Sequence, residues 1–156
     1  MPKFPLRRAC FLLSLALLSA AGAALAQAPQ QRLPTVTLNA GIHVIRAEVA
    51  QRPEERVMGL MLRPSMPVND GMLFAFEQPG VQCFWMKDTL VPLSAAFVAD
   101  DGRIVNIEDM KPRSEDQHCS VRPVRFVLEM NQGWFARRGI KPGSKLQGAP
   151  FGNGAR

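Results

Sequence analysis

The stretch MLFAFEQPGVQCFWMKDTLVPLSAAFVADDGRIVNIEDM, residues 72–110, decides the predicted fold. It holds four short apolar segments, at residues 72–76, 81–86, 93–99 and 103–110. Turn-forming residues separate these segments, most clearly Pro79-Gly80 and the Asp-Asp-Gly sequence at 100–102. Connections this short leave no room for the crossover that joins parallel strands, so we expect a mainly antiparallel sheet.

More strands are predicted on both sides of this stretch. β-branched residues alternate with other residues at 35–38 and 42–49, and Asn39-Ala40-Gly41 lies between the two segments. Because these three residues favour a turn, the segments predict a hairpin. Residues 124–130 and 144–146 predict two further strands. The polar residues 111–123, which come before the first of these two strands, predict a long surface loop.

Two short helices complete the prediction. The first spans 53–61, because Pro53 suits the first helical position and the apolar period changes there. Its expected apolar face consists of Val57, Leu60 and Met61. Gly59 inside this helix indicates a close approach to another backbone.

The second helix spans 132–138, with Asn131 as its cap and Gly139 at its end. Strands outnumber helices throughout, so the predicted fold class is all-β, or β-rich α+β. We expect a small, mainly antiparallel β-sandwich or partly closed barrel with two short helices.

The N-terminus is typical of a secretory signal peptide. Lys3, Arg7 and Arg8 precede an apolar segment at 9–18, and small residues follow as far as Ala26. This segment is shorter than the roughly 20 apolar residues that span a bilayer. We expect cleavage after Ala26 and a periplasmic or secreted protein without a membrane span; a retained N-terminal anchor is the alternative.

Cleavage leaves one domain of ordinary size. We expect a flexible leader at 27–34, a single β-rich domain at 35–147 and a Gly-rich disordered tail at 148–156. The full chain has a net charge of +6. Removal of the signal takes away three basic residues, so the mature chain has 16 basic and 13 acidic residues and a net charge of +3. Charges of both signs are interspersed, so we expect no nucleic-acid partner. No feature of the sequence indicates a particular oligomeric state.

Two cysteines remain after cleavage, Cys83 and Cys119. Exported proteins usually pair their cysteines, so we predict a disulfide between them. Two buried thiols that pack as small hydrophobes are the alternative. A redox-active pair is disfavoured because the chain has no Cys-x-x-Cys motif.

The candidate site centres on residues 83–89, where an apolar strand pattern meets a cation, a carboxylate and a hydroxyl. Alternation along an extended strand places Trp85 and Lys87 on one face and Phe84 and Met86 on the other. If Phe84 and Met86 are buried, Trp85 and Lys87 face a cleft or solvent, where they can hold a ligand. The structural alternative is a Trp85 packed in a core. Asp88 belongs to the candidate site or to a turn.

Arg56, Arg63 and Glu129 are the other candidate ligand-binding residues. The planar guanidinium groups of the two arginines suit carboxylate or phosphate recognition, although a solvated helix face is an ordinary alternative. Glu129 alternates with apolar neighbours in a predicted strand, so it must face water or pair with a cation, such as Lys87 or Arg56.

The order of motifs resembles an uncharacterised conserved bacterial family, domain-of-unknown-function family 192. The residues that carry the resemblance are Pro53-Glu54-Glu55-Arg56, Gly59-Leu60-Met61, Arg63, Asp70-Gly71-Met72-Leu73-Phe74, Phe84-Trp85-Met86-Lys87, Pro92-Leu93, Ala96-Phe97, Leu128-Glu129, Gly133-Trp134 and Gly139-Ile140-Lys141-Pro142-Gly143. The resemblance covers roughly residues 44–146 and implies a small β-rich domain, often exported, without an agreed activity. Two positions depart from the family pattern: Asp88 stands where Asn is common, and Ser94 where an acidic residue is common.

Three functions are consistent with these residues. The favoured one is a non-catalytic, periplasmic ligand-binding module with a polar cleft around Trp85 and Lys87, for an unidentified small-molecule or polymer ligand. A hydrolase that acts on sugar or cell-wall material through Asp88 and Glu129 is the second. A copper(I)-binding protein is the third, because soft sulfur ligands select that ion. Its ligands would come from His118, Cys119, Met58, Met61, Met66, Met72, Met86, Met110 and Met130.

Catalytic motifs are missing from the sequence, which contains no Gly-x-Ser-x-Gly, His-Glu-x-x-His or phosphate-binding loop. The methionines form no dense Met-x-Met cluster, and Met is an ordinary filler of irregular cores. We therefore predict no catalytic residue, no metal site and no cofactor, and we favour a protein that is not an enzyme.

Overall fold

The protein is described by a computed structural model that covers residues 32–151. Its strands are β1 (Thr35–Ala40), β2 (His43–Ala50), β3 (Asp70–Gly80), β4 (Cys83–Phe84), β5 (Leu93–Val98), β6 (Ile104–Met110), β7 (His118–Cys119), β8 (Val124–Asn131) and β9 (Leu146–Gln147). Its helices are α1 (Pro53–Met58) and the 3₁₀ helix η1 (Ala136–Arg138).

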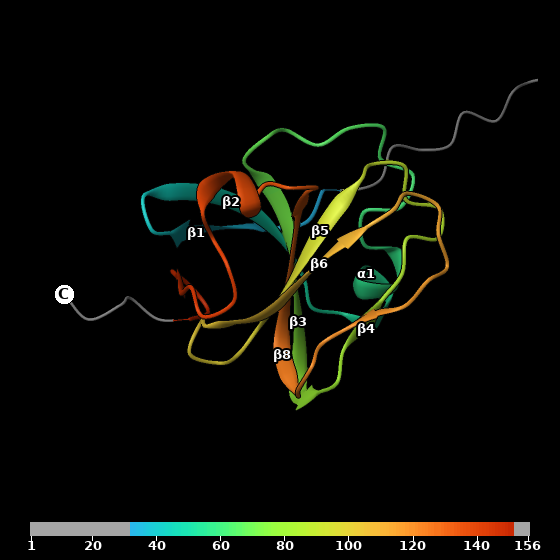
Figure 1. The fold of residues 1–156 in the computed structure, drawn as a ribbon. Coiled ribbons are helices and arrows are strands. Elements are labelled where there is room, and N and C mark those ends of the chain that lie inside the picture. The colour runs from blue at the N-terminus through green and yellow to red at the C-terminus, as the bar shows by residue number, and fades with distance from the viewer. Residues whose placement is uncertain (1–31, 152–156) are drawn as a thin grey trace, which may run out of the picture.

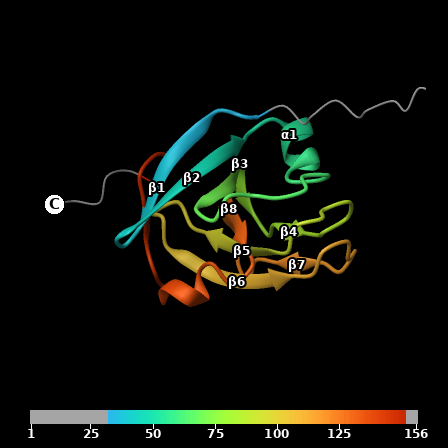
Figure 2. The same ribbon diagram turned by 90° about the horizontal axis from the view of Figure 1, so that it is seen from above.

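Seven strands form one sheet in the order β6-β5-β8-β3-β2-β1-β9, which curves into a half-barrel (Figures 1 and 2). The prediction of a β-rich, partly closed barrel is confirmed. The hairpin predicted near the N-terminus is also confirmed, because β1 and β2 pair antiparallel around Gly41. The expected signal peptide lies outside the described residues.

One strand pair differs from the prediction. β2 and β3 are parallel, with Arg46 opposite Asp70 and Ala50 opposite Phe74. The crossover between them is residues 51–69, which the sequence indicates as a helix and a loop and which are long enough to return the chain to the same end of the sheet. All other pairs in the sheet are antiparallel.

The predicted strand at 81–86 is much shorter than expected. Only Cys83 and Phe84 form β4, and they pair with β7 in a separate two-stranded ribbon. β7 lies within the segment predicted as a surface loop, and it places His118 opposite Phe84. Figure 2 shows this ribbon beside β5 and β6, on the same side of the molecule as α1.

Both faces of the sheet are covered by apolar side chains. On β8, Phe126, Leu128 and Met130 join one core, together with the buried Trp134. Val127 faces the other core, which is the one covered by α1, its following loop and β4. That second core consists of Ala50, Leu60, Met72, Phe74, Met86, Val91, Leu93, Ala95, Phe97, Met110, Val124 and Val127. Glu129 is two residues from Val127 and therefore points to the same side.

Both helices are shorter than predicted. α1 ends at Met58, because Gly59 adopts φ +47 and ψ −128, a conformation that suits glycine. A Cβ on Gly59 would lie 3.2 Å from the Phe74 ring, so the predicted close approach is to a side chain and not to another backbone. Val57 is exposed, contrary to the predicted apolar face.

The second helix is reduced to η1, and Gly139 ends it in the left-handed conformation as expected. Asn131 is not its cap: the Asn131 side chain donates hydrogen bonds to the carbonyl oxygens of Met66 and Pro67 instead. Residues 148–151 of the predicted Gly-rich tail are part of the described structure, where Phe151 is only 8% exposed and packs edge-on against Phe126. Within residues 32–151, no helix has the length and apolar character needed to cross a membrane.

Candidate binding site

A cleft of about 350 Å³ lies between α1 and the β4 segment. Its walls consist of Pro53, Arg56, Val57, Met61, Phe76, Gln82, Cys83, Phe84 and Trp85. Most of these side chains are apolar, so the cleft is less polar than predicted. Arg56 and Gln82 supply its polar groups.

Trp85 is the large aromatic side chain of this cleft that also faces water. Met86 is fully buried and Phe84 packs against the second core, so the predicted alternation holds and Trp85 is turned outward, 45% exposed. The structural alternative of a core Trp85 is therefore wrong. The Lys87 ammonium lies 5.5 Å from the centre of the Trp85 ring, a cation–π contact that fixes the indole.

Arg56 projects from α1 into the wall of the cleft. Its Nη1 donates hydrogen bonds to the carbonyl oxygens of Gln51 and Ala75, the latter at 3.2 Å. The guanidinium carbon also lies 4.9 Å from the centre of the Phe76 ring. Glu129, the carboxylate predicted as a partner, does not bind it. Glu55, the residue before Arg56, accepts hydrogen bonds from the backbone N–H groups of Gln51 and Arg52 instead.

A second, smaller cavity of about 40 Å³ adjoins the cleft. Five residues line both spaces, namely Arg56, Val57, Met61, Phe84 and Trp85. The deeper walls of the small cavity include Gly59, Phe74, Thr89 and Glu129. The cleft and this inner cavity therefore form one continuous candidate site, with Glu129 at its inner end.

Glu129 is an acidic side chain in an apolar place. It lies on β8, opposite Met72 on one side and Ala95 on the other, and it is 4% exposed. Within residues 32–151 neither Lys87 nor Arg56 pairs with it, contrary to the prediction. Burial raises the pKa of Glu129 to about 8, because the charged form loses its hydration. Near neutral pH the carboxyl is therefore mostly uncharged and can donate a hydrogen bond.

The predicted disulfide is present, and one of its cysteines, Cys83, lines the cleft. Cys83 and Cys119 stand opposite each other in the β4–β7 ribbon, with sulfur atoms 2.08 Å apart. This bond joins β4 to a segment 36 residues further along the chain. It therefore fixes the strand that precedes Trp85.

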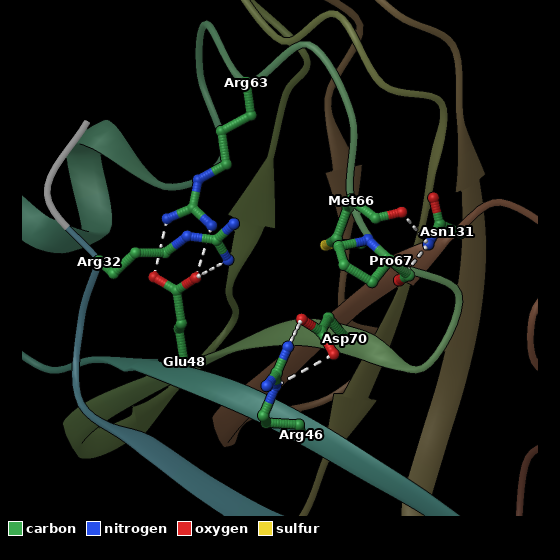
Figure 3. A network of polar contacts seen from close by, with 8 residues as sticks. All are labelled: Arg32, Arg46, Glu48, Arg63, Met66, Pro67, Asp70 and Asn131. Atoms are coloured by element: carbon green, nitrogen blue, oxygen red, sulfur yellow. Dashed lines mark hydrogen bonds and ion pairs between the residues drawn. The ribbon is translucent and has the colours of Figure 1, made fainter. Parts of the chain in front are cut away.

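Arg63 lies away from the cleft, in a buried ion pair with Glu48 (Figure 3). Its Nη1 and Nη2 donate to the two oxygens of Glu48 at 2.6 and 2.8 Å, and Arg32 and the Leu33 N–H donate to the same carboxylate. Burial opposes the charge of Glu48, but the hydrogen bond from Arg63 and those from Leu33 and Arg32 outweigh it and lower its pKa to about 2. This network ties Arg32 and Leu33 to β2.

Asp88 has a structural role in a turn of the backbone. It adopts a positive φ of 54, which Asp and Asn tolerate better than most residues, and its carbonyl oxygen accepts a hydrogen bond from the Leu62 N–H at 2.9 Å. Asp88 does not line the cavity of Glu129. Ser94, the other departure from the family pattern, is buried; its hydroxyl donates to Asp109 and accepts a hydrogen bond from the Gly133 N–H.

The methionines are divided between the two cores and the site. Met72, Met86 and Met110 fill one core and Met130 the other, while Met58 and Met61 line the inner cavity. The Cys119 sulfur is bonded to Cys83. Across residues 32–151, no group of three or more His, Cys, Asp or Glu side chains is placed to hold a metal ion.

Several residues of the site were not predicted from the sequence. The sequence predicts a core face for Val57 and Met61 and no role for Phe76 and Gln82. Thr89 is the hydroxyl at the end of the predicted stretch 83–89, but its place beside Glu129 is not predicted. The sequence does carry one signal for Val57 and Met61. Their short apolar segment, residues 57–62, is followed by a Pro-rich loop, so no further helical turn can cover these side chains. The sequence carries no comparable signal for Phe76 or Gln82. Phe76 lies at the register shift of β3, and Gln82 lies directly before β4.

Comparison with known proteins gives a family and two solved structures. The sequence model of DUF192, described as Uncharacterized ACR, matches residues 35–148. A proposed transcription regulator from Sinorhizobium meliloti 1021 is 37% identical, with a TM-score of 0.73, and the match covers 77% of this chain and 98% of that one. A protein of unknown function from Novosphingobium aromaticivorans DSM 12444 is also 37% identical, with a TM-score of 0.70 and coverage of 86% and 99%. No curated protein matches.

Proposed function

The chain belongs to the DUF192 family, Uncharacterized ACR, and we propose that it is a non-catalytic binding module for a small ligand with an apolar or aromatic body. The ligand lies in the cleft between α1 and Trp85. One observation carries this proposal: a tryptophan that is 45% exposed stands in the wall of a mainly apolar cleft. Concave apolar sites with a few polar groups are typical ligand sites.

The surroundings of the cleft support the same function. Val57, which lines the cleft, is 73% exposed, and Met58 beside it is also exposed. Large apolar side chains that gather at a surface usually contact a ligand or partner. The cation–π contact of Lys87 and the disulfide at Cys83 hold the opposite wall in place, which limits the entropy lost on binding.

A binding role fits the chemistry of the lining better than a catalytic one. Among the residues that line the cleft and the inner cavity, Glu129 is the single carboxyl and Cys83 is bonded in a disulfide. A hydrolase of the two-carboxylate type needs a second carboxyl on the same substrate. Asp88 is not in this lining.

Export is part of the proposal. The N-terminal signal pattern and a disulfide between the two remaining cysteines both suit an oxidising compartment. Mass spectrometry of the protein recovered from the periplasm or medium should give a chain that begins at Gln27. A full-length chain in the cytoplasm would contradict export while leaving the binding proposal open to its own test.

The regulatory role ascribed to the Sinorhizobium protein is not carried over to this chain. Among residues 32–151, six arginines form ion pairs with acidic residues: Arg32, Arg46, Arg52, Arg63, Arg103 and Arg125. Pairing reduces the positive potential that a phosphate backbone would need. An exported location would also separate the protein from DNA.

The proposal is tested by a thermal-shift screen of aromatic and aliphatic fragments, followed by NMR titration of each hit. Fragments that raise the melting temperature should shift the indole N–H resonance of Trp85. The Trp85→Ala variant should bind them roughly tenfold more weakly, since stacking on an aromatic ring contributes about 1 kcal/mol or more.

Ile42→Ala is the matched control. Ile42 is an exposed apolar residue in the β1–β2 turn, on the opposite side of the molecule from α1 and β4 in Figure 1. Its substitution should leave fragment binding unchanged. Hits that bind the Trp85→Ala variant as tightly as the wild type would rule out this cleft as the ligand site.

A further inference from the structure

The burial of the Glu129 carboxyl is not explained by the fold or by an apolar ligand in the cleft. Glu129 lies on β8, in the middle of the sheet, yet it points into the core that contains Met72, Phe74 and Phe97. Among residues 32–151 no hydrogen bond or ion pair to its carboxyl is found. Its oxygens are not sealed in the core, because Glu129 lines the inner cavity. A carboxyl among apolar side chains without a protein partner is costly unless water or a ligand satisfies it, so its presence calls for an explanation.

The inner cavity provides the place where a partner can bind. Glu129 lines this space of about 40 Å³, which adjoins the larger cleft through the shared side chains of Arg56 and Trp85. On this measure one water molecule needs roughly 10–15 Å³, so the inner cavity has room for a head group of a few non-hydrogen atoms and not for a ring. A ligand with its body in the cleft can therefore place one small polar group beside Glu129.

The charge of the lining restricts that group. Burial raises the pKa of Glu129 to about 8, so near neutral pH the carboxyl is mostly a neutral donor and acceptor. A cationic head group would require Glu129 to ionise in apolar surroundings, close to the positive Arg56. An anionic head group would lose its hydration, and the Arg56 guanidinium already donates to the carbonyl oxygens of Gln51 and Ala75.

We propose that Glu129 selects ligands whose apolar body ends in a small uncharged hydrogen-bonding group, a primary amide or a hydroxyl. The carboxyl O–H donates to the oxygen of that group, and the carboxyl C=O accepts from its N–H or O–H. This inference rests on the proposed function, because it concerns the inner end of the same cleft.

Four probes with one aromatic body and different head groups test the inference: benzamide, toluene, benzoate and benzylamine. Each is titrated into the protein at pH 6.5, with the Trp85 indole N–H as the NMR readout. Benzamide should bind roughly tenfold more tightly than the other three, the effect of about one well-formed hydrogen bond.

Two variants assign the selectivity to Glu129. Glu129→Gln retains a donor and an acceptor and should keep the preference for benzamide. Glu129→Leu removes both and should lower benzamide affinity to that of toluene, while toluene binds as well as before. Circular dichroism and melting temperature show whether both variants are folded. If Glu129→Leu does not fold, the role of Glu129 is decided by the ranking of the four probes on the wild type and on Glu129→Gln.

The outcomes separate this inference from the proposed function. Equal binding of benzamide and toluene to the wild type would overturn the role of Glu129 and leave the cleft as the ligand site. Preference for benzoate or benzylamine would also overturn it, because the selected group would then be charged. If other fragments bind at Trp85 but none of the four probes binds at millimolar concentration, the inference about Glu129 is wrong and the proposed function stands. If nothing binds at Trp85, both are wrong.

Discussion

At the scale of single residues, two glutamates show how surroundings set the charge of one residue type. Glu48 and Glu129 are each 4% exposed. Arg63, Arg32 and the Leu33 N–H all donate to Glu48, and its pKa falls to about 2 in spite of burial. Glu129 has no such donors within the described chain, and burial raises its pKa to about 8. The first carboxylate serves the fold and the second is available to a ligand.

The buried pair of Glu48 and Arg63 leads to a prediction about stability. Arg63→Leu should lower the free energy of unfolding by about 3–5 kcal/mol, because it removes two hydrogen bonds from a buried carboxylate. Urea denaturation measures the change. The double variant Glu48→Leu, Arg63→Leu should recover part of the loss, because no buried charge remains.

Arg46→Leu is the matched control for this prediction. Arg46 also pairs with a carboxylate, that of Asp70 at 2.5 Å, but its side chain is 63% exposed. Solvent screens such a pair, so the loss should be about 1 kcal/mol or less. Equal losses for the Arg63 and Arg46 variants would show that the Glu48 network is not a buried structural pair.

At the scale of elements, the β4–β7 ribbon is the part of the fold that most needs outside support. An isolated ribbon of two residue pairs is unstable in water. Its support includes the disulfide between its strands and the Phe84 ring, which packs edge-on against Phe74 and Phe97. The Asn106 side chain also donates a hydrogen bond to the Cys119 carbonyl oxygen. Because Trp85 follows directly after β4, the ribbon positions one wall of the cleft.

Loss of the disulfide should therefore affect both stability and the cleft. The double variant Cys83→Ser, Cys119→Ser opens a loop of 36 residues and should lower the free energy of unfolding by about 4 kcal/mol. Amide hydrogen exchange should accelerate first around β4 and Trp85. Uniform acceleration across the sheet would contradict a local role for this bond, and unchanged stability would contradict a structural one.

At the scale of the whole molecule, the two buried glutamates give stability opposite dependences on pH. Glu48 has a lowered pKa, so its contribution is present above about pH 4.5 and is lost as the pH falls toward 2. Glu129 has a raised pKa, so the folded state keeps a proton that the unfolded chain loses above about pH 4.5. Stability therefore falls as pH rises from about 4.5 toward 8, and it should be greatest near pH 5.

The substitution Glu129→Gln should remove the alkaline part of this dependence. Between pH 5 and 7 the wild type should lose about 1.4 kcal/mol of unfolding free energy per pH unit, and the variant should lose far less. At pH 7 the variant should be more stable by roughly 3 kcal/mol, an order-of-magnitude value. Urea denaturation across this range measures both slopes. A wild-type profile that is flat from pH 5 to 7 would mean that Glu129 is ionised in the folded protein.

Much of the fold follows from local sequence patterns. Alternation and turn residues identify the hairpin of β1 and β2, and the strands β5, β6 and β8, to within a residue or two. The same alternation predicts that Met86 and Trp85 lie on opposite faces, and the structure decides that Met86 is the buried one. The cysteine pair follows from composition and expected location. These features depend on short-range geometry, which a single chain segment already specifies.

Only the tertiary structure decided the rest. It pairs β2 with β3 in parallel, places Arg63 against Glu48 and away from the cleft, and shortens β4 to two residues. It also gathers Arg56, Trp85 and Glu129 around adjoining spaces without pairing their charges. Charge pairing and burial depend on which surfaces meet across the fold. Periodicity along one strand carries no information about that, because it fixes the face of a side chain and not the neighbour that covers it.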